Sequence, residues 1–160
     1  MSIFGHEPGE SRKKSILTQP GFRFGFIGAL VAISVNLFFL LIYSGDTRGD
    51  WISWIIQFVV YIFISRASAE AQYRENQMRG DLEHLRGVKA AGLGAGLITS
   101  ILVWLYIIIR GVVRDAYGVF IAMDPFSFVC LMMVDVSIAM AMGSWGGSAV
   151  AGKYSEDRSY

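Results

Sequence analysis

Four long apolar segments, separated by charged stretches, are the feature of this sequence that most restricts its fold. They lie at about residues 24–43, 51–69, 90–109 and 126–151. A helix that crosses a bilayer needs about 20 predominantly apolar residues. The first and third segments reach that length without a charge, and Asp135 is the one charge in the fourth. Arg66 interrupts the second segment, where a long basic side chain can reach the headgroups. The pattern predicts an all-α integral membrane protein with four transmembrane helices.

The distribution of basic residues predicts the orientation. Eleven of the 14 Lys and Arg residues lie in the N-terminal segment, the connection between the second and third spans, and the C-terminal tail. Basic connections are retained in the cytoplasm. We therefore expect two tandem helical hairpins in the cell (plasma or inner) membrane, with both termini cytoplasmic. The predicted organisation is a polar N-terminal segment at 1–20, a transmembrane domain at 21–152 and a tail at 153–160.

The two predicted hairpins resemble each other in sequence. With a shift of 66 residues, GFRFGFIGALVAISVNLFFLLIYSG aligns with GVKAAGLGAGLITSILVWLYIIIRG. Gly28 meets Gly94 and Ser34 meets Ser100 in this alignment. The similarity indicates an internal repeat of two parallel hairpins, an arrangement found in some transporters. A duplicated structural bundle would give the same pattern.

Three GxxxG pairs lie towards the predicted cytoplasmic side. Small residues let helix backbones approach closely inside a membrane. We therefore predict helix packing at these positions, either within the chain or against another subunit. Large aromatic residues fill the outer half, so the helices are expected to spread there. The predicted packing residues are Gly21, Gly25, Gly92, Gly96, Gly143 and Gly147.

The connection at residues 70–87 is predicted to continue the second span as a cytoplasmic helical linker. Oppositely charged residues four apart, Glu70 with Arg74 and Glu75 with Arg79, support a helix, as does Arg79 with Glu83. Gly87 is expected to break the helix before the third span. The acids nearly balance the bases, which argues against a nucleic-acid partner.

Asp135 is the most informative residue in the spans. It lies eleven residues after Asp124, about 16 Å along a helix and close to the bilayer midplane. An ionised carboxylate there costs about 2.5–3.5 kcal/mol on insertion scales. We therefore expect it to face the bundle interior. Counting depth along the other spans puts Ser34, Thr99 and Ser100 at its level, whereas Asn36 and Gln57 lie further out and are expected to bond to each other. These six residues form the predicted intramembrane polar site.

Two interpretations of Asp135 remain open. It binds a proton or cation that exchanges with a substrate, or it is a neutral acid that holds helices together. One acid without a second titratable partner makes a poor proton relay. The sequence predicts no catalytic residues, no cofactor and no metal site, since Cys130 is its one cysteine and both histidines lie in polar stretches. An enzyme is not expected.

These features lead to two functional hypotheses. The first is a non-catalytic accessory or scaffold subunit, with the lipid bilayer and other membrane protein subunits or copies of itself as partners. The alternative is a small oligomeric transporter or channel that uses Asp135 for proton or cation coupling. In size the chain resembles the four-span small multidrug transporters. In that family the key acid is a glutamate of the first span, so the resemblance assigns no role to a residue of this chain.

Overall fold

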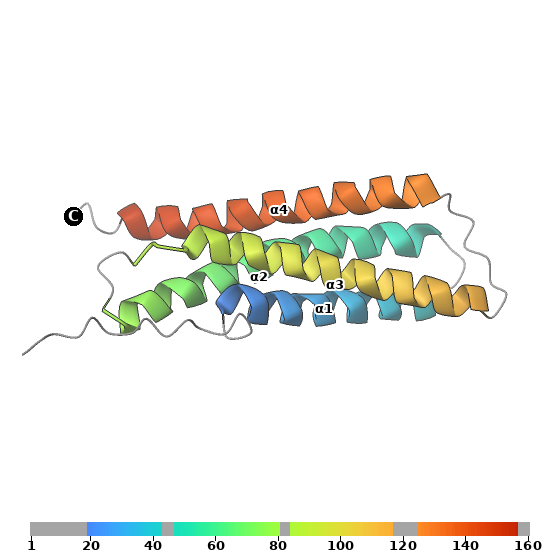
Figure 1. Ribbon diagram of the computed structural model, residues 1–160, viewed down its shortest axis with the longest axis horizontal. Helices are drawn as coiled ribbons and strands as arrows, with labels where there is room; N and C mark the ends of the chain where they lie inside the picture. Colours follow the sequence, from blue (N-terminus) through green and yellow to red (C-terminus); the bar gives the residue numbers. More distant parts are fainter. Residues whose placement is uncertain (1–18, 43–46, 81–83, 117–124, 157–160) are drawn as a thin grey trace, which may run out of the picture.

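The computed structural model describes residues 19–42, 47–80, 84–116 and 125–156, which are almost entirely helical. Successive helices run in opposite directions along one long axis (Figure 1). Each described helix contains a stretch that is long and apolar enough to cross a membrane, which bears out the prediction of an all-helical chain with four such segments. The helices are α1 (Pro20–Ile42), α2 (Thr47–Met78), α3 (Val88–Ala116) and α4 (Pro125–Glu156).

Most of the apolar side chains point away from the bundle. In the candidate span of α4 only 17% of the residues are buried. Leu41 is 79% exposed, and Phe63 and Phe126 are exposed to a similar degree. A soluble protein rarely leaves so much contiguous apolar surface in water. This surface fits a membrane protein, because lipid tails can cover it.

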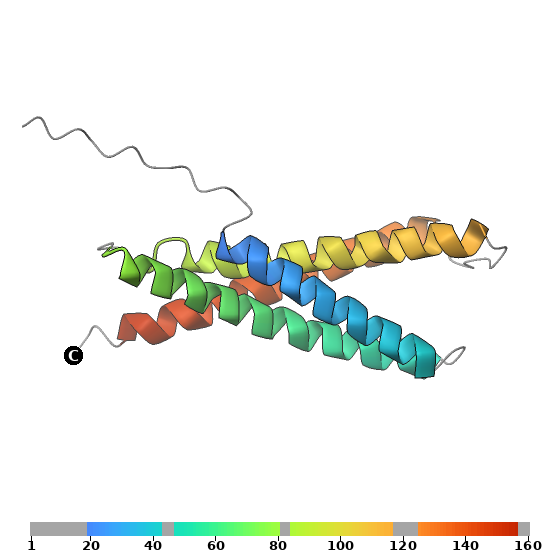
Figure 2. The ribbon, with the colours of Figure 1, turned by 90° about the horizontal axis from the view of Figure 1, so that it is seen from below.

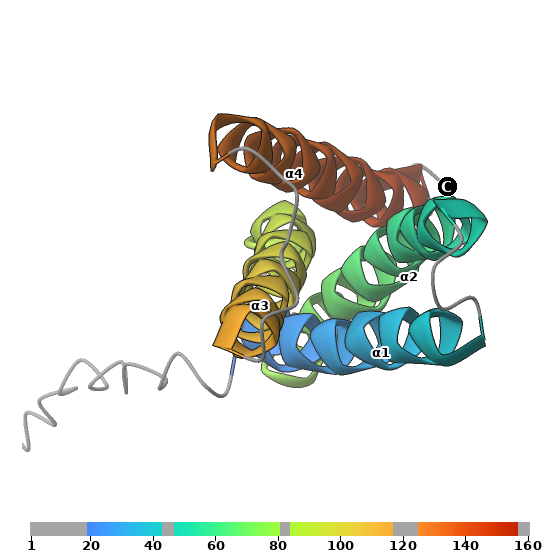
Figure 3. The same ribbon diagram turned by 90° about the vertical axis from the view of Figure 1, so that its right-hand side faces the viewer.

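The helices do not form a square bundle. Every pair of helices is in contact except α1 and α4, which do not meet in the described segments. Figure 3 shows α1 and α4 on separate sides of the molecule, with α2 and α3 between them. Any polar site that α4 builds inside the bundle must therefore draw its partners from α2 and α3.

The bundle has a tight half and an open half. We call the end where α1 and α3 begin the glycine-rich end, and the other the opposite end. Towards the opposite end, α1 and α2 part from α3 and α4 (Figure 2). The predicted glycines all lie in the tight half, at contacts between helices of this chain: Gly21 and Gly25 on α1 face α3, Gly92 and Gly96 on α3 face α4, and Gly143 and Gly147 on α4 face α3.

The closest of these contacts joins α3 to α4. A Cβ atom placed on Gly96 would lie 2.5 Å from the carbonyl oxygen of Ala139, and one on Gly92 would lie 2.8 Å from that of Gly143. A backbone carbonyl cannot move aside as the end of a flexible side chain can. Glycine is therefore required at both positions for α3 and α4 to approach this closely.

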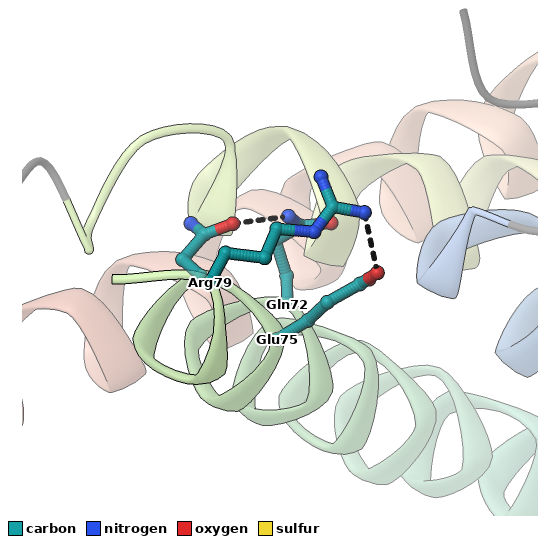
Figure 4. A network of polar contacts seen from close by, with 4 residues as sticks. Gln72, Glu75 and Arg79 are labelled. Atoms are coloured by element: carbon teal, nitrogen blue, oxygen red, sulfur yellow. Dashed lines mark hydrogen bonds and ion pairs between the residues drawn. The ribbon is translucent and has the colours of Figure 1, made fainter. Parts of the chain in front are cut away.

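The structure corrects the prediction that a helix continues to residue 87. Helix α2 ends at Met78, and Gly80 follows with a φ of 69°, a conformation that costs glycine little. In the last turn of α2, the Asn76 side chain donates hydrogen bonds of 2.9 Å to the carbonyl oxygens of His84 and Arg86. These bonds hold the residues just before α3 against the end of α2. The Arg79 guanidinium still pairs with Glu75 at 2.9 Å (Figure 4). Glu83 lies outside the described residues.

The Gly96 contact leads to a direct test of the packing. We expect Gly96→Ala to destabilise the protein by about 1–3 kcal/mol, the usual cost of forcing an extra methyl group into a tight contact. Gly94 is the matched control, because a Cβ there meets no atom within 4 Å. Gly94→Ala should be neutral, or stabilising by up to about 1 kcal/mol through helix propensity. Denaturant unfolding in detergent, followed by circular dichroism, measures both variants. Equal stability of the two would contradict the packing argument.

Candidate functional site

The inward face of α4 carries Asp135 followed by small residues. Asp135 is completely buried, and Ala139 and Gly143 follow it at steps of one helical turn. Because residues four apart share a face of a helix, the same rotation of α4 that turns its small residues inward also turns Asp135 inward. The packing of α4 therefore places the carboxylate at its contact with α2 and α3.

Three short hydrogen bonds converge on one oxygen of this carboxylate. The Ser100 hydroxyl donates to Asp135 Oδ2 at 2.7 Å. The Tyr61 hydroxyl and the Trp104 indole N–H donate to the same oxygen, each at 2.9 Å. The Gln57 amide nitrogen lies at the longer distances of 3.4 Å from Oδ1 and 3.5 Å from Oδ2. Helix α2 thus supplies Tyr61 and Gln57, and helix α3 supplies Ser100 and Trp104.

The hydrogen-bond donors around Asp135 explain how a carboxylate can lie inside the bundle. An ionised acid at the centre of a membrane costs about 2.5–3.5 kcal/mol or more. A hydrogen bond to a charged group contributes about 1.5–3 kcal/mol. Three short bonds are therefore sufficient to offset the cost without a basic counter-ion. The indole N–H and the amide nitrogen can only donate, which suits an oxygen that accepts.

Two of the residues predicted at the polar site reach Asp135, and they are Ser100 and Gln57. Ser34 does not, because its hydroxyl donates to the Leu30 carbonyl of its own helix at 2.8 Å and α1 does not touch α4. Thr99 faces α1 instead, where its hydroxyl donates to the Gly25 carbonyl at 3.0 Å. Ser34 and Thr99 lie at a suitable depth but on the wrong side of their helices.

The predicted bond between Asn36 and Gln57 is also wrong. The Asn36 amide nitrogen donates to Ser53 Oγ at 3.3 Å, and its carbonyl oxygen accepts a bond from the Arg110 guanidinium at 3.1 Å. Ser53 lies one turn before Gln57 on α2, closer to the opposite end of the bundle. Asn36 therefore bonds to Ser53 and not to Gln57. Arg110 adds a basic group that the predicted site did not include.

Sequence reasoning missed Tyr61 and Trp104 as partners of Asp135. Both are aromatic residues with a polar tip, and the large aromatic residues of the outer half were expected only to spread the helices there. A signal was present, however. Tyr61 follows Gln57 by four residues and Trp104 follows Ser100 by four. Each pair therefore shares one helix face, so a search for polar-tipped residues one turn from a candidate site would have found both.

Within the described helices, no group of three or more His, Cys, Asp or Glu side chains is placed to hold a metal ion. The side chains at the site are an acid, a phenol, a hydroxyl, an indole and an amide. Comparison of the chain with protein-family models, curated proteins and solved structures gave no match.

Trp104 offers a test of the hydrogen-bond network. Trp104→Phe keeps an aromatic ring but removes the indole donor to a buried carboxylate, so we expect a loss of about 1–3 kcal/mol in the free energy of unfolding. Trp145→Phe is the matched control, because Trp145 is 56% exposed. Its replacement should change stability by less than about 0.5 kcal/mol. Detergent-solubilised protein unfolded with denaturant gives both values, and an equal effect of the two substitutions would show that the indole bond contributes nothing.

Proposed function

We propose that this protein is a small proton-coupled membrane transport protein, a transporter or channel, in which Asp135 takes up and releases a proton. The observation that carries this proposal is the 2.9 Å contact between the Tyr61 hydroxyl and the Asp135 carboxylate. The sequence alone offered one acid without a titratable partner, which is a poor relay. Tyr61 supplies a hydroxyl, which can both donate and accept a proton, at hydrogen-bond distance from the acid. Ionisable residues inside a membrane commonly mark proton or ion pathways.

Two further observations weigh against a purely structural scaffold. The glycine faces that suggested docking to another subunit are used within the chain, as the contacts of Gly25 with Ala95 and of Gly96 with Ala139 illustrate. The interior also places four polar side chains from two helices around Asp135. Both points favour the transport hypothesis over the accessory-subunit hypothesis.

The proposed topology places the glycine-rich end in the cytoplasm of a cell. Basic residues gather at this end, and Arg74, Arg79 and Lys89 are exposed there. The positive-inside tendency then puts both termini in the cytoplasm and the protein in the plasma or inner membrane. In this topology α1 with α2, and α3 with α4, are the two tandem hairpins of the internal repeat.

Proton exchange at Asp135 can be followed by infrared difference spectroscopy on the reconstituted protein. We expect a carboxyl band that gains amplitude as the pH is lowered and that is absent from Asp135→Asn. Proton uptake by vesicles under an imposed membrane potential should also be lost in Asp135→Asn. Ser137→Ala is the control, because Ser137 is exposed on the same helix and bonds only to the Met133 carbonyl in the described structure. A carboxyl band that stays constant at every pH at which the protein is folded would mean a sealed structural acid.

The accessory or scaffold subunit remains a second candidate because of the exposed face of α4. Phe126, Val129, Met133 and Val134 are each at least half exposed along this helix. Such a face fits lipid, another membrane protein or a second copy of this chain. If the protein is an accessory subunit, it should co-purify with other membrane proteins in mild detergent and lose them in a Val134→Lys variant. Migration as a lone monomer under those conditions would count against this candidate.

A further inference from the structure

Polar side chains continue from Asp135 towards the opposite end of the bundle. Gln57 lies beside the carboxylate, and Ser53 precedes it by one turn on α2. Asn36 of α1 donates to Ser53 Oγ at 3.3 Å, and Arg110 of α3 donates to Asn36 Oδ1 at 3.1 Å. We call Gln57, Ser53, Asn36 and Arg110 the polar column. It joins three helices, and the contacts among Ser53, Asn36 and Arg110 do not involve Asp135 itself.

The column passes from two buried residues to two part-exposed ones. Gln57 and Ser53 are buried, with exposed fractions of 8% and 3%, whereas Asn36 and Arg110 are part-exposed. The column also lies in the half of the molecule where the two helix pairs diverge (Figure 2). It therefore leads from the fully buried carboxylate towards water at the opposite end.

Buried polar side chains also lie in the glycine-rich half, but those described are not linked to Asp135 by side-chain hydrogen bonds: the hydroxyl of Ser65, one turn after Tyr61 on α2, makes no hydrogen bond. Ala139, one turn beyond Asp135, is completely buried and its carbonyl lies against Gly96. The hydroxyls of Thr99 and Ser68 donate to backbone carbonyls, at 3.0 Å to Gly25 and 3.0 Å to Ala91. Backbone carbonyls accept these bonds but cannot pass a proton on. The tight half of the bundle thus separates Asp135 from the glycine-rich end.

We propose that, with the helices arranged as described, Asp135 exchanges its proton with water at the opposite end, through the polar column, and that Arg110 is a charged gate at its mouth. Release to the other face of the membrane then requires a different arrangement of the helices. This inference rests on the proposed function, since it assigns the route for the same proton. In the uptake direction, hydronium at the mouth gives up one proton, ordered water and the Ser53 hydroxyl relay it, and one O–H bond forms on the Asp135 carboxylate. The reverse sequence returns the proton to water.

The groups of the column have different parts in this route. A hydroxyl both accepts and donates through one oxygen, so Ser53 can relay a proton, while the amides of Asn36 and Gln57 orient their neighbours. The Arg110 guanidinium stays charged and repels cations that approach the mouth. The groups that face Asp135 itself are Gln57 and Tyr61 from α2 and Ser100 and Trp104 from α3, and Tyr61 is the one among them with an ionisable side chain.

The test is the rate at which the carboxyl band of the reconstituted full-length protein shifts after rapid mixing with D₂O. We expect Ser53→Ala to slow the exchange by about ten-fold, the rate change that corresponds to about 1.4 kcal/mol at the barrier. Arg110→Gln should speed the exchange, because it removes the repelling charge and keeps an amide that can still donate to Asn36. Circular dichroism and thermal unfolding check that each variant is folded.

Ser65→Ala is the matched control on the other side of Asp135. Ser65 is a completely buried serine on the same helix, and its hydroxyl makes no hydrogen bond in the described structure. Removing it therefore costs no bond, and the exchange rate should not change. If Ser65→Ala slows the exchange and Ser53→Ala does not, the proton enters from the glycine-rich end and the inference is wrong.

Oriented vesicles test the side of entry. The exposed turn at Arg79 and Gly80 marks the glycine-rich end, so a protease added outside reports which way the protein faces. We expect faster exchange when D₂O is applied to the opposite end. Equal rates from both sides would overturn the one-sided route. A wild-type band that neither titrates nor exchanges would overturn the proposed function itself, whereas normal exchange in Ser53→Ala and Arg110→Gln would overturn the column alone.

Discussion

The hydrogen bonds to Asp135 are the interaction on which the rest of the interior depends. No lipid tail can solvate a carboxylate, so the protein must supply the donors that water would otherwise provide. Tyr61, Ser100 and Trp104 bring short bonds from α2 and α3 to one oxygen of an acid on α4. These bonds require the three helices to meet at one depth and each helix to turn one particular face inward. Packing of apolar side chains alone would tolerate several rotations of each helix about its own axis.

Helices α1 and α4 both pack against helix α3. Ala91 and Ala95 receive the glycines of α1, while Gly92 and Gly96 receive α4. Two neighbouring faces of small residues on one helix keep α1 and α4 apart, because each occupies its own face. This separation explains why the Asp135 site draws nothing from α1, although Ser34 lies at a suitable depth. The two positions that the sequence alignment matches have unequal environments: Gly28 is packed against Thr99 and Ile64, while a Cβ on Gly94 would meet no neighbour within 4 Å.

The two halves of the bundle differ in the chemistry available to a proton. On one side of Asp135, the helix backbones pack closely through glycines, and the hydroxyls of Thr99 and Ser68 are bonded to carbonyl oxygens. On the other side, polar side chains from α1, α2 and α3 contact one another as far as Arg110. A buried acid at the boundary between a tightly packed half and a half with linked polar side chains suits a site that communicates with one face of a membrane at a time. That property is the physical basis of the function proposed for this chain.

The sequence by itself determined the four helices, the inward direction of Asp135 and the depth of its partners. These follow from quantities that are local to each segment: about 20 apolar residues span a bilayer, and a helix rises about 1.5 Å per residue. Depth counting accordingly found Ser100, and it placed Gln57 only slightly too far out. The tertiary structure decided which residues at each depth face one another. It brought in Tyr61 and Trp104, left out Ser34 and Thr99, and paired Asn36 with Ser53 and Arg110. The reason is that side-chain packing between distant segments sets the rotation of each helix about its axis and the angle at which two helices cross. The depth of a residue along its own helix contains no information about either.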